Sequence, residues 1–101
     1  MIDLKPFFNP KSVLIIGASR KEFTFNYTIL KNLLEIFYQG KIFIVNPNAS
    51  EILGVKSYHS LKDLPEVPEL AVILLGDQIL QIVKQLAKYG IKYIAIQSEL
   101  Q

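Results

Sequence analysis

Four short, almost wholly apolar runs are separated by longer segments in which apolar residues recur at helical spacing. The runs are rich in β-branched residues and lack the polar alternation of a strand with one face in water. Strands buried on both faces have this pattern, which indicates a parallel sheet covered by helices. The predicted strands are residues 13–16, 42–45, 71–75 and 93–96.

Two amphipathic helices are predicted between these strands. Gly40 stands where the first would end, and the second has Asp77 as its predicted N-cap and Gly90 at its end. In the middle of the chain, residues 54–58 are predicted to form a short edge strand, and residues 60–63 have capping-box spacing before a proline. The apolar stripes consist of Ile29, Leu30, Leu33, Leu34, Ile36 and Phe37 in the first helix and Ile79, Ile82, Val83 and Leu86 in the second.

These elements predict one α/β domain over residues 1–101, a Rossmann-like parallel sheet with helices on both faces. Right-handed crossovers place its five strands in the order 3-2-1-4-5. The chain changes direction between strands 1 and 4, so the loops after Ile16 and Leu75 are expected to diverge and leave a crevice. Ligands of such sheets bind there, at the carboxyl ends of the strands.

The loop after the first strand is the predicted ligand site. Gly17 allows a sharp turn, Ser19 adds a hydroxyl, and Arg20 and Lys21 add positive charge before a helix that starts near Asn26. The N-terminus of a helix attracts anions, so a phosphate group is the predicted ligand. A purely structural turn has the same local pattern and stays open as an alternative.

The glycine and acid positions bear on which nucleotide is bound. No glycine occurs between Gly17 and Gly40, so the G-x-G-x-x-G fingerprint is absent. An NAD site also needs an acid after the second strand, where this chain has Asn46, Pro47 and Asn48. The sequence therefore disfavours NAD and leaves CoA or another phosphorylated nucleotide open.

Short sequence matches in register extend through most of the chain. They lie in residues 6–13, 15–19, 32–34, 40–42, 45–47, 51–56, 60–65 and 70–73. On these residues the chain resembles the CoA-binding domain of ADP-forming acyl-CoA synthetases, which are relatives of the succinyl-CoA synthetase alpha subunit. The resemblance implies that CoA lies across the strand ends, with contacts at Gly17, Ala18, Ser19, Arg20, Lys21, Asn26, Pro47, Asn48, Leu75, Gly76, Gln97 and Ser98.

The chain departs from the family's pattern at several of these positions. The family has glycine where Phe23 and Asn26 stand, and lysine where Asn48 stands. It has Val-Pro at residues 75–76 and a Ser-Ala-Gly turn at residues 97–99, where this chain has other side chains. Each departure removes something that favours CoA.

Composition narrows the chemistry further. The chain has 101 residues, half of them hydrophobic, no cysteine and a formal net charge of +2. The lack of cysteine excludes a disulfide scaffold, a cysteine nucleophile and a Cys-based zinc site. The sequence also lacks the basic stripe that would indicate nucleic-acid binding. No apolar run is long enough to cross a membrane and no secretory signal is visible, so a cytoplasmic location is expected. His59, the only histidine, is predicted to be a turn residue, and no spacing indicates a metal site or a complete catalytic set.

Three functions are open as hypotheses. The first is a CoA-binding module, not catalytic alone, that works with other domains or subunits of an acyl-CoA synthetase. The second is a degenerate relative that has lost CoA and serves as an interaction or regulatory module, and the third is an NAD(H) sensor. Because the chain stops soon after the last strand, exposed apolar surface there is expected to favour a homo-oligomer or docking on a partner domain.

Overall fold

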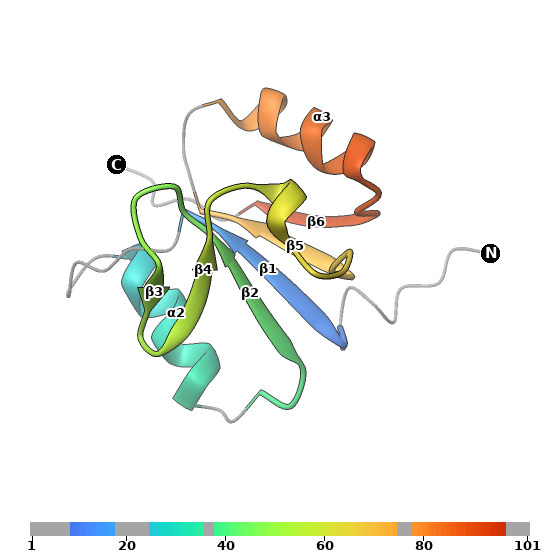
Figure 1. The fold of residues 1–101 in the computed structure, drawn as a ribbon. Coiled ribbons are helices and arrows are strands. Elements are labelled where there is room, and N and C mark those ends of the chain that lie inside the picture. The colour runs from blue at the N-terminus through green and yellow to red at the C-terminus, as the bar shows by residue number, and fades with distance from the viewer. Residues whose placement is uncertain (1–8, 18–24, 36–37, 75–77, 97–101) are drawn as a thin grey trace.

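The computed structural model describes residues 9–17, 25–35, 38–74 and 78–96, with only the backbone of Phe25 and Asn26 (Figure 1). In these residues a six-stranded sheet has the order β3-β4-β2-β1-β5-β6. The α/β, Rossmann-like class is therefore confirmed. The elements are β1 (Ser12–Ile16), α2 (Phe25–Glu35), β2 (Lys41–Val45), β3 (Glu51–Ile52), β4 (Val55–Tyr58), the 3-10 turn η1 (Leu61–Asp63), β5 (Leu70–Ile73), α3 (Ile79–Tyr89) and β6 (Tyr93–Ile96).

The five predicted strands correspond to β1, β2, β4, β5 and β6, and they lie in the predicted relative order. β1 pairs in parallel with β2 on one side and with β5 on the other, and β4 and β6 continue the sheet outward. The two-residue strand β3 is an addition to the predicted order, and it pairs antiparallel with β4. A tight hairpin joins β3 and β4 through Leu53 and Gly54, both at positive φ (52° and 81°). The sheet is thus parallel except at this edge.

Helices α2 and α3 cover opposite faces of the sheet (Figure 1). Leu30 of α2 is fully buried in one core cluster, with Val13 and Ile15 of β1. Leu86 of α3 is fully buried in the other cluster, with Leu14 of β1. Successive residues of a strand point to opposite faces, so an unbroken apolar run supplies both cores.

The predicted end of α3 is confirmed, whereas its N-cap is a different residue from the predicted one. Gly90 ends the helix as expected, at φ 115°, and its N–H donates to the carbonyls of Leu86 and Ala87, both at 3.1 Å. This left-handed conformation is the one that favours glycine after a helix. The N-cap is Gln78, itself left-handed at φ 58°, and not Asp77, which lies outside the described residues.

Gly40 directly precedes β2. It was predicted to end the first helix, but the structure requires glycine there because of close packing. A Cβ at this position would lie 2.6 Å from the carbonyl oxygen of Lys11 and would overlap the ring of Tyr38. The helix α2 already ends at Glu35. A side chain at residue 40 would therefore separate the start of β2 from the start of β1.

The short helical turn predicted at residues 60–63 is η1, and the chain leaves it in an extended conformation at Leu64. The Ser60 hydroxyl donates to Oδ2 of Asp63 at 3.0 Å and makes no side-chain cap to a backbone N–H. The predicted helical turn is confirmed, but the hydrogen bonds of a capping box do not form there.

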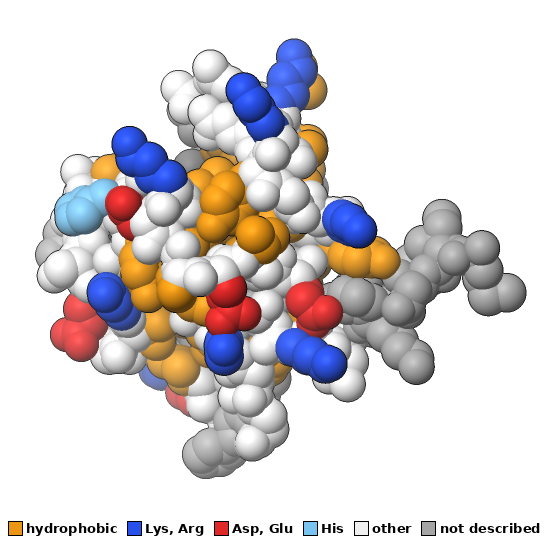
Figure 2. All heavy atoms as spheres, turned by 45° about the vertical axis from the view of Figure 1, so that its right-hand side comes forward, with side chains coloured by type: hydrophobic (Ala, Val, Ile, Leu, Met, Phe, Trp, Pro, Cys, Tyr) orange, Lys and Arg blue, Asp and Glu red, His pale blue; other side chains and the backbone are white. Residues whose placement is uncertain are grey.

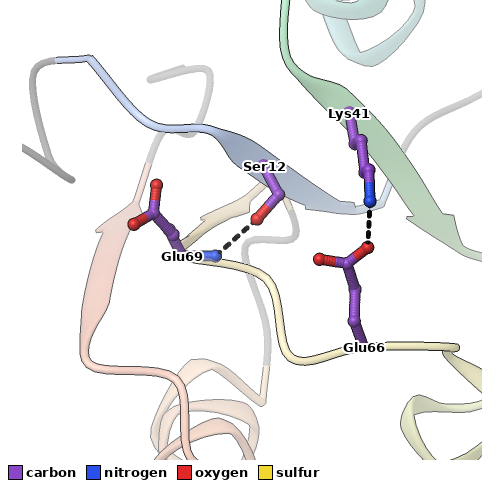
Figure 3. A network of polar contacts seen from close by, with 4 residues as sticks. All are labelled: Ser12, Lys41, Glu66 and Glu69. Atoms are coloured by element: carbon purple, nitrogen blue, oxygen red, sulfur yellow. Dashed lines mark hydrogen bonds and ion pairs between the residues drawn. The ribbon is translucent and has the colours of Figure 1, made fainter.

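At the amino ends of the strands, polar side chains connect the segment before β5 to β1 and β2 (Figure 3). The backbone N–H of Glu69 donates to Oγ of Ser12 at 2.9 Å, and the Glu69 carboxylate accepts the backbone N–H of Lys11 at 2.6 Å. The Lys41 ammonium donates to Oε1 of Glu66 at 2.7 Å. We call these five residues the amino rim. Figure 2 shows acidic and basic side chains close together on this part of the surface.

Candidate functional site

The first strand lies at the point where the sheet changes its winding direction. Ile16, the last residue of β1, pairs with Val45 of β2 and with Ile73 of β5. The N–H of Leu74 donates to the carbonyl of Ile16 at 2.8 Å, so the ends of β1 and β5 remain side by side beyond the last strand pair. From these ends the chain continues to α2 on one face and to α3 on the other. Such a switch point is where open α/β sheets bind ligands.

The sharp turn predicted after β1 is confirmed at Gly17, which has φ 98°. L-residues with a Cβ rarely adopt this conformation, so glycine is the residue that suits this position. Helix α2 starts eight residues later, at Phe25, and has no acidic residue in its first turn. The positive end of its dipole is thus not neutralised by a side chain of its own first turn.

The turn after β2 is held in place by hydrogen bonds. Oδ1 of Asn46 accepts the N–H of Asn48 at 2.8 Å, and the Asn46 carbonyl accepts the N–H of Ala49 at 3.4 Å. The end of β4 adds two more bonds, because the Asn46 N–H donates to Tyr58 O at 2.9 Å and the Ser57 hydroxyl donates to Asn46 O at 3.3 Å. No residue of the segment 46–49 is acidic. The groups that follow β2 therefore form an ordered turn with no carboxylate.

His59 contacts the same turn from the end of β4. Its Nδ1 lies 3.1 Å from the carbonyl oxygen of Pro47, and both residues are exposed. The sequence predicts a turn residue here, and the structure confirms an exposed turn. What the sequence reasoning missed is its neighbour, although β4 was already predicted to lie beside β2. We call Gly17, residues 46–49, His59 and Leu74 the carboxyl rim.

The structure places some of the predicted contact residues and leaves others outside the described ranges. Gly17, Pro47 and Asn48 lie at the carboxyl ends of the adjacent strands β1 and β2, and the backbone of Asn26 lies in the first turn of α2. Pro47 and Asn48 are both exposed. The predicted contacts outside the described ranges are Ala18, Ser19, Arg20, Lys21, Leu75, Gly76, Gln97 and Ser98.

Two further properties of the described ranges bear on the chemistry. Residues 9–17, 25–35, 38–74 and 78–96 contain no group of three or more His, Cys, Asp or Glu side chains that could hold a metal ion. Neither α2 nor α3, the helices of these ranges, is long and apolar enough to cross a bilayer.

A family model described as "CoA binding domain" matches residues 11–101 of the chain. The chain is 40% identical over 97 residues to acetate–CoA ligase [ADP-forming] II of Archaeoglobus fulgidus, which covers 95% of this chain and 14% of that protein. It is 37% identical over 100 residues to acetate–CoA ligase [ADP-forming] I subunit alpha of Pyrococcus furiosus, covering 94% of this chain and 22% of that protein.

Solved structures agree with this similarity. The dinucleotide forming acetyl-coenzyme A synthetase 1 of Ca. Korarchaeum cryptofilum superposes with a TM-score of 0.84 at 34% identity, over 91% of this chain and 20% of that chain. The present chain thus spans a fifth or less of that synthetase and of the Archaeoglobus ligase.

Proposed function

Because this chain belongs to the CoA binding domain family, we propose that it binds CoA with the nucleotide across the carboxyl rim and the diphosphate between Gly17 and the first turn of α2. The observation that carries this proposal is the position of β1 between β2 and β5, with helices leaving on opposite faces. A helix N-terminus without an acidic first turn favours an anion at that place.

The charged part of the proposed site comes from the loop between β1 and α2. Arg20 and Lys21 are the only cations between Gly17 and Phe25, and Glu22 is the only acid. A diphosphate beside this loop would receive charge-assisted hydrogen bonds, which are stronger than neutral ones. We propose that the other predicted contacts, Ala18, Ser19, Asn26, Pro47, Asn48, Leu75, Gly76, Gln97 and Ser98, line the remaining length of CoA.

We further propose that the bound CoA serves the interconversion of an acid and its acyl-CoA, with the chemistry completed by other domains or subunits. Two relatives are ADP-forming acetate–CoA ligases, and this chain matches 14% and 22% of their lengths. His59 is the only histidine of the sequence, and its Nδ1 is occupied by the Pro47 carbonyl. The domain would therefore hold the cofactor and leave the catalytic groups to its partners.

An interaction or regulatory module is the second candidate, and exposed apolar side chains favour it. Leu80, in the first turn of α3, is 69% exposed, and Ile96, at the end of β6, is 49% exposed. Asn48 also stands where a lysine would favour a phosphate. A domain that had lost CoA but kept a partner would retain such a surface.

A ligand titration separates these functions. The thermal midpoint of the domain is measured with CoA, 3′-dephospho-CoA, ADP and NADH. A ligand at 100 times its dissociation constant should stabilise the fold by about 2.7 kcal/mol, or roughly 10–20 °C for a domain of this size. A shift with CoA supports the proposal, no shift with any ligand supports the interaction module, and a shift with NADH alone supports a sensor.

Charge reversal then locates the diphosphate. The double variant Arg20→Glu and Lys21→Glu is expected to lose at least about hundredfold in CoA affinity, because two attractive charges become repulsive. The matched control is Lys84→Glu with Lys92→Glu, which makes the same change of net charge at two exposed positions outside the carboxyl rim. Equal affinity losses in both double variants would show a general charge effect and would place the phosphates elsewhere.

A further inference from the structure

The hydrogen bond between His59 and Pro47 determines which ring nitrogen carries a proton. A carbonyl oxygen only accepts hydrogen bonds, so Nδ1, 3.1 Å away, must be the donor. In the neutral ring Nε2 is then an acceptor, and it becomes a donor only when the imidazole is cationic. The Pro47 carbonyl thus holds the ring in one tautomer and leaves Nε2 as the end that changes with protonation.

The position of His59 in the fold bears on what Nε2 could bind. In doubly wound sheets the groups that follow the second strand read the ribose of a nucleotide, with an acid for free hydroxyls or a cation for a ribose phosphate. In this chain residues 46–49 after β2 carry neither an acid nor a cation. An ionisable side chain that contacts this turn is His59, which directly follows the neighbouring strand β4.

The charged groups on the surrounding elements are engaged elsewhere or exposed. The Lys56 ammonium lies 4.9 Å from the centre of the Tyr58 ring, and Asp63 accepts the hydroxyl of Ser60 at 3.0 Å. Glu51 on β3 and Lys62 on η1 are exposed. The ion pairs found among the described ranges are Lys31–Glu35 and Lys41–Glu66, neither of which involves His59.

We propose that His59 recognises a phosphate on the ribose of the bound nucleotide through Nε2, and takes up a proton from solvent when it does. This rests on the proposed binding of CoA at the carboxyl rim. A ribose phosphate is a dianion that accepts hydrogen bonds, so it stabilises the cationic ring, in which both nitrogens donate: Nδ1 to Pro47 and Nε2 to the phosphate. His59 thereby selects CoA over 3′-dephospho-CoA, although Asn48 stands where a lysine would supply the charge.

Two substitutions of His59 separate the roles of the two ring nitrogens. His59→Asn can keep a donor near the position of Nδ1 and removes Nε2, whereas His59→Lys supplies a permanent cation without the ring. Affinities for CoA, 3′-dephospho-CoA and NADPH are measured by titration calorimetry for the wild type and both variants. The control is Lys92→Gln, which removes one exposed positive charge before β6, at the opposite end of the strands.

The expected result is a CoA preference over 3′-dephospho-CoA that falls at least about fivefold in His59→Asn, returns in part in His59→Lys and is unchanged in Lys92→Gln. Calorimetry at pH 8 in two buffers of different ionisation enthalpy should show proton uptake with CoA in the wild type and less in His59→Asn. NADPH binding that matched CoA in strength and in its dependence on His59 would show that any ribose phosphate is read.

The outcomes distinguish this proposal from the proposed function. A wild type that binds neither CoA nor 3′-dephospho-CoA overturns both. A wild type that binds the two equally, or a His59→Asn variant that keeps the wild-type preference and proton uptake, overturns only the role of His59.

Discussion

At the amino ends of the strands, side chains form hydrogen bonds with groups from distant parts of the sequence, whereas at the carboxyl ends the described hydrogen bonds hold turns mainly through backbone atoms. The amino rim joins Ser12 to Glu69 and Lys41 to Glu66 (Figure 3), and the Glu69 carboxylate also accepts the backbone N–H of Lys11. At the carboxyl rim, the hydrogen bonds of residues 46–49 run within the turn or to the end of β4. The amino rim is joined through side chains, whereas the carboxyl rim joins Ile16 to Leu74 and Asn46 to Tyr58 through backbone atoms.

This difference assigns stability and binding to opposite ends of one sheet. At the amino rim, the polar side chains of Ser12, Lys41, Glu66 and Glu69 bond to other residues of the rim. Residues at the carboxyl rim sit on loops carried by a rigid sheet, which is where binding groups usually lie. Substitutions at the amino rim should therefore change the free energy of unfolding, and those at the carboxyl rim should change ligand affinity more than stability.

The largest stability difference between the rims is expected for two buried serines. Ser12 is 4% exposed and its Oγ accepts the N–H of Glu69, so Ser12→Ala leaves that donor without this partner. Ser57 is 5% exposed and donates to the Asn46 carbonyl, which also accepts the N–H of Ala49. We expect Ser12→Ala to cost about 2 kcal/mol of unfolding free energy and Ser57→Ala less than about 1 kcal/mol.

Denaturant unfolding of both serine variants checks this expectation, with CoA affinity as a second readout. Ser12→Ala should leave affinity unchanged, because the amino rim lies at the opposite ends of the strands from the proposed site. A Ser57→Ala variant that lost more stability than Ser12→Ala would show that the carboxyl rim also holds the fold together.

Two left-handed glycines allow a comparison at equal backbone strain. Gly17 has φ 98° and Gly90 has φ 115°, so alanine at either position should cost about 1 kcal/mol of stability. A Cβ at Gly90 would meet only Val67 Cγ1, at an ordinary 3.8 Å. Thermal unfolding of Gly17→Ala and Gly90→Ala should therefore give similar losses.

The two glycine variants should differ in ligand binding. Gly17→Ala adds a methyl group where the backbone is proposed to approach the diphosphate, so CoA affinity should fall at least about tenfold beyond the stability effect. Gly90→Ala should bind CoA as the wild type does. If both variants kept full affinity, the phosphates would not pass close to Gly17.

The sheet was predictable from the sequence because its central strands are buried on both faces. Unbroken apolar runs identified them, and the handedness of the crossovers ordered them. The strand β3 could not be predicted from the sequence, because the two residues Glu51 and Ile52 are too few to show a periodic pattern. The hairpin signal was also weak, since Leu53 occupies a left-handed position that usually carries glycine, asparagine or aspartate.

The candidate site was predictable only in its backbone part. Gly17 after an apolar run indicated the turn at the switch point, and the geometry confirms it. His59 could not be assigned a partner from spacing, because its contact with Pro47 spans 12 residues and depends on the pairing of β2 with β4. The CoA contacts predicted at residues 17–21, 26, 47–48, 75–76 and 97–98 all stay predictions.

The smallest expected effect is the response to alkaline pH of Tyr38, which lies beside the amino rim. Burial, and secondarily the Glu69 carboxylate, raise the pKa of Tyr38 above its usual value of 10.0. The Tyr38 hydroxyl also donates to the carbonyl of Pro10 at 2.7 Å. Above about pH 10 the unfolded chain loses the Tyr38 proton while the folded chain keeps it, so stability is full below that pH and falls as the pH rises through the folded pKa.

Tyr38→Phe removes both the hydrogen bond and this titration. At pH 7 it should cost about 0.5–1 kcal/mol, and the difference from the wild type should shrink at pH 11, where the wild type has lost part of its advantage. Glu69→Gln is the control that keeps an oxygen acceptor for the Lys11 N–H and removes only the charge, so it should reduce the alkaline loss without abolishing it, because burial remains the larger cause. A Tyr38→Phe variant whose deficit was the same at pH 7 and pH 11 would show that Tyr38 stabilises the fold through its hydrogen bond to Pro10 alone.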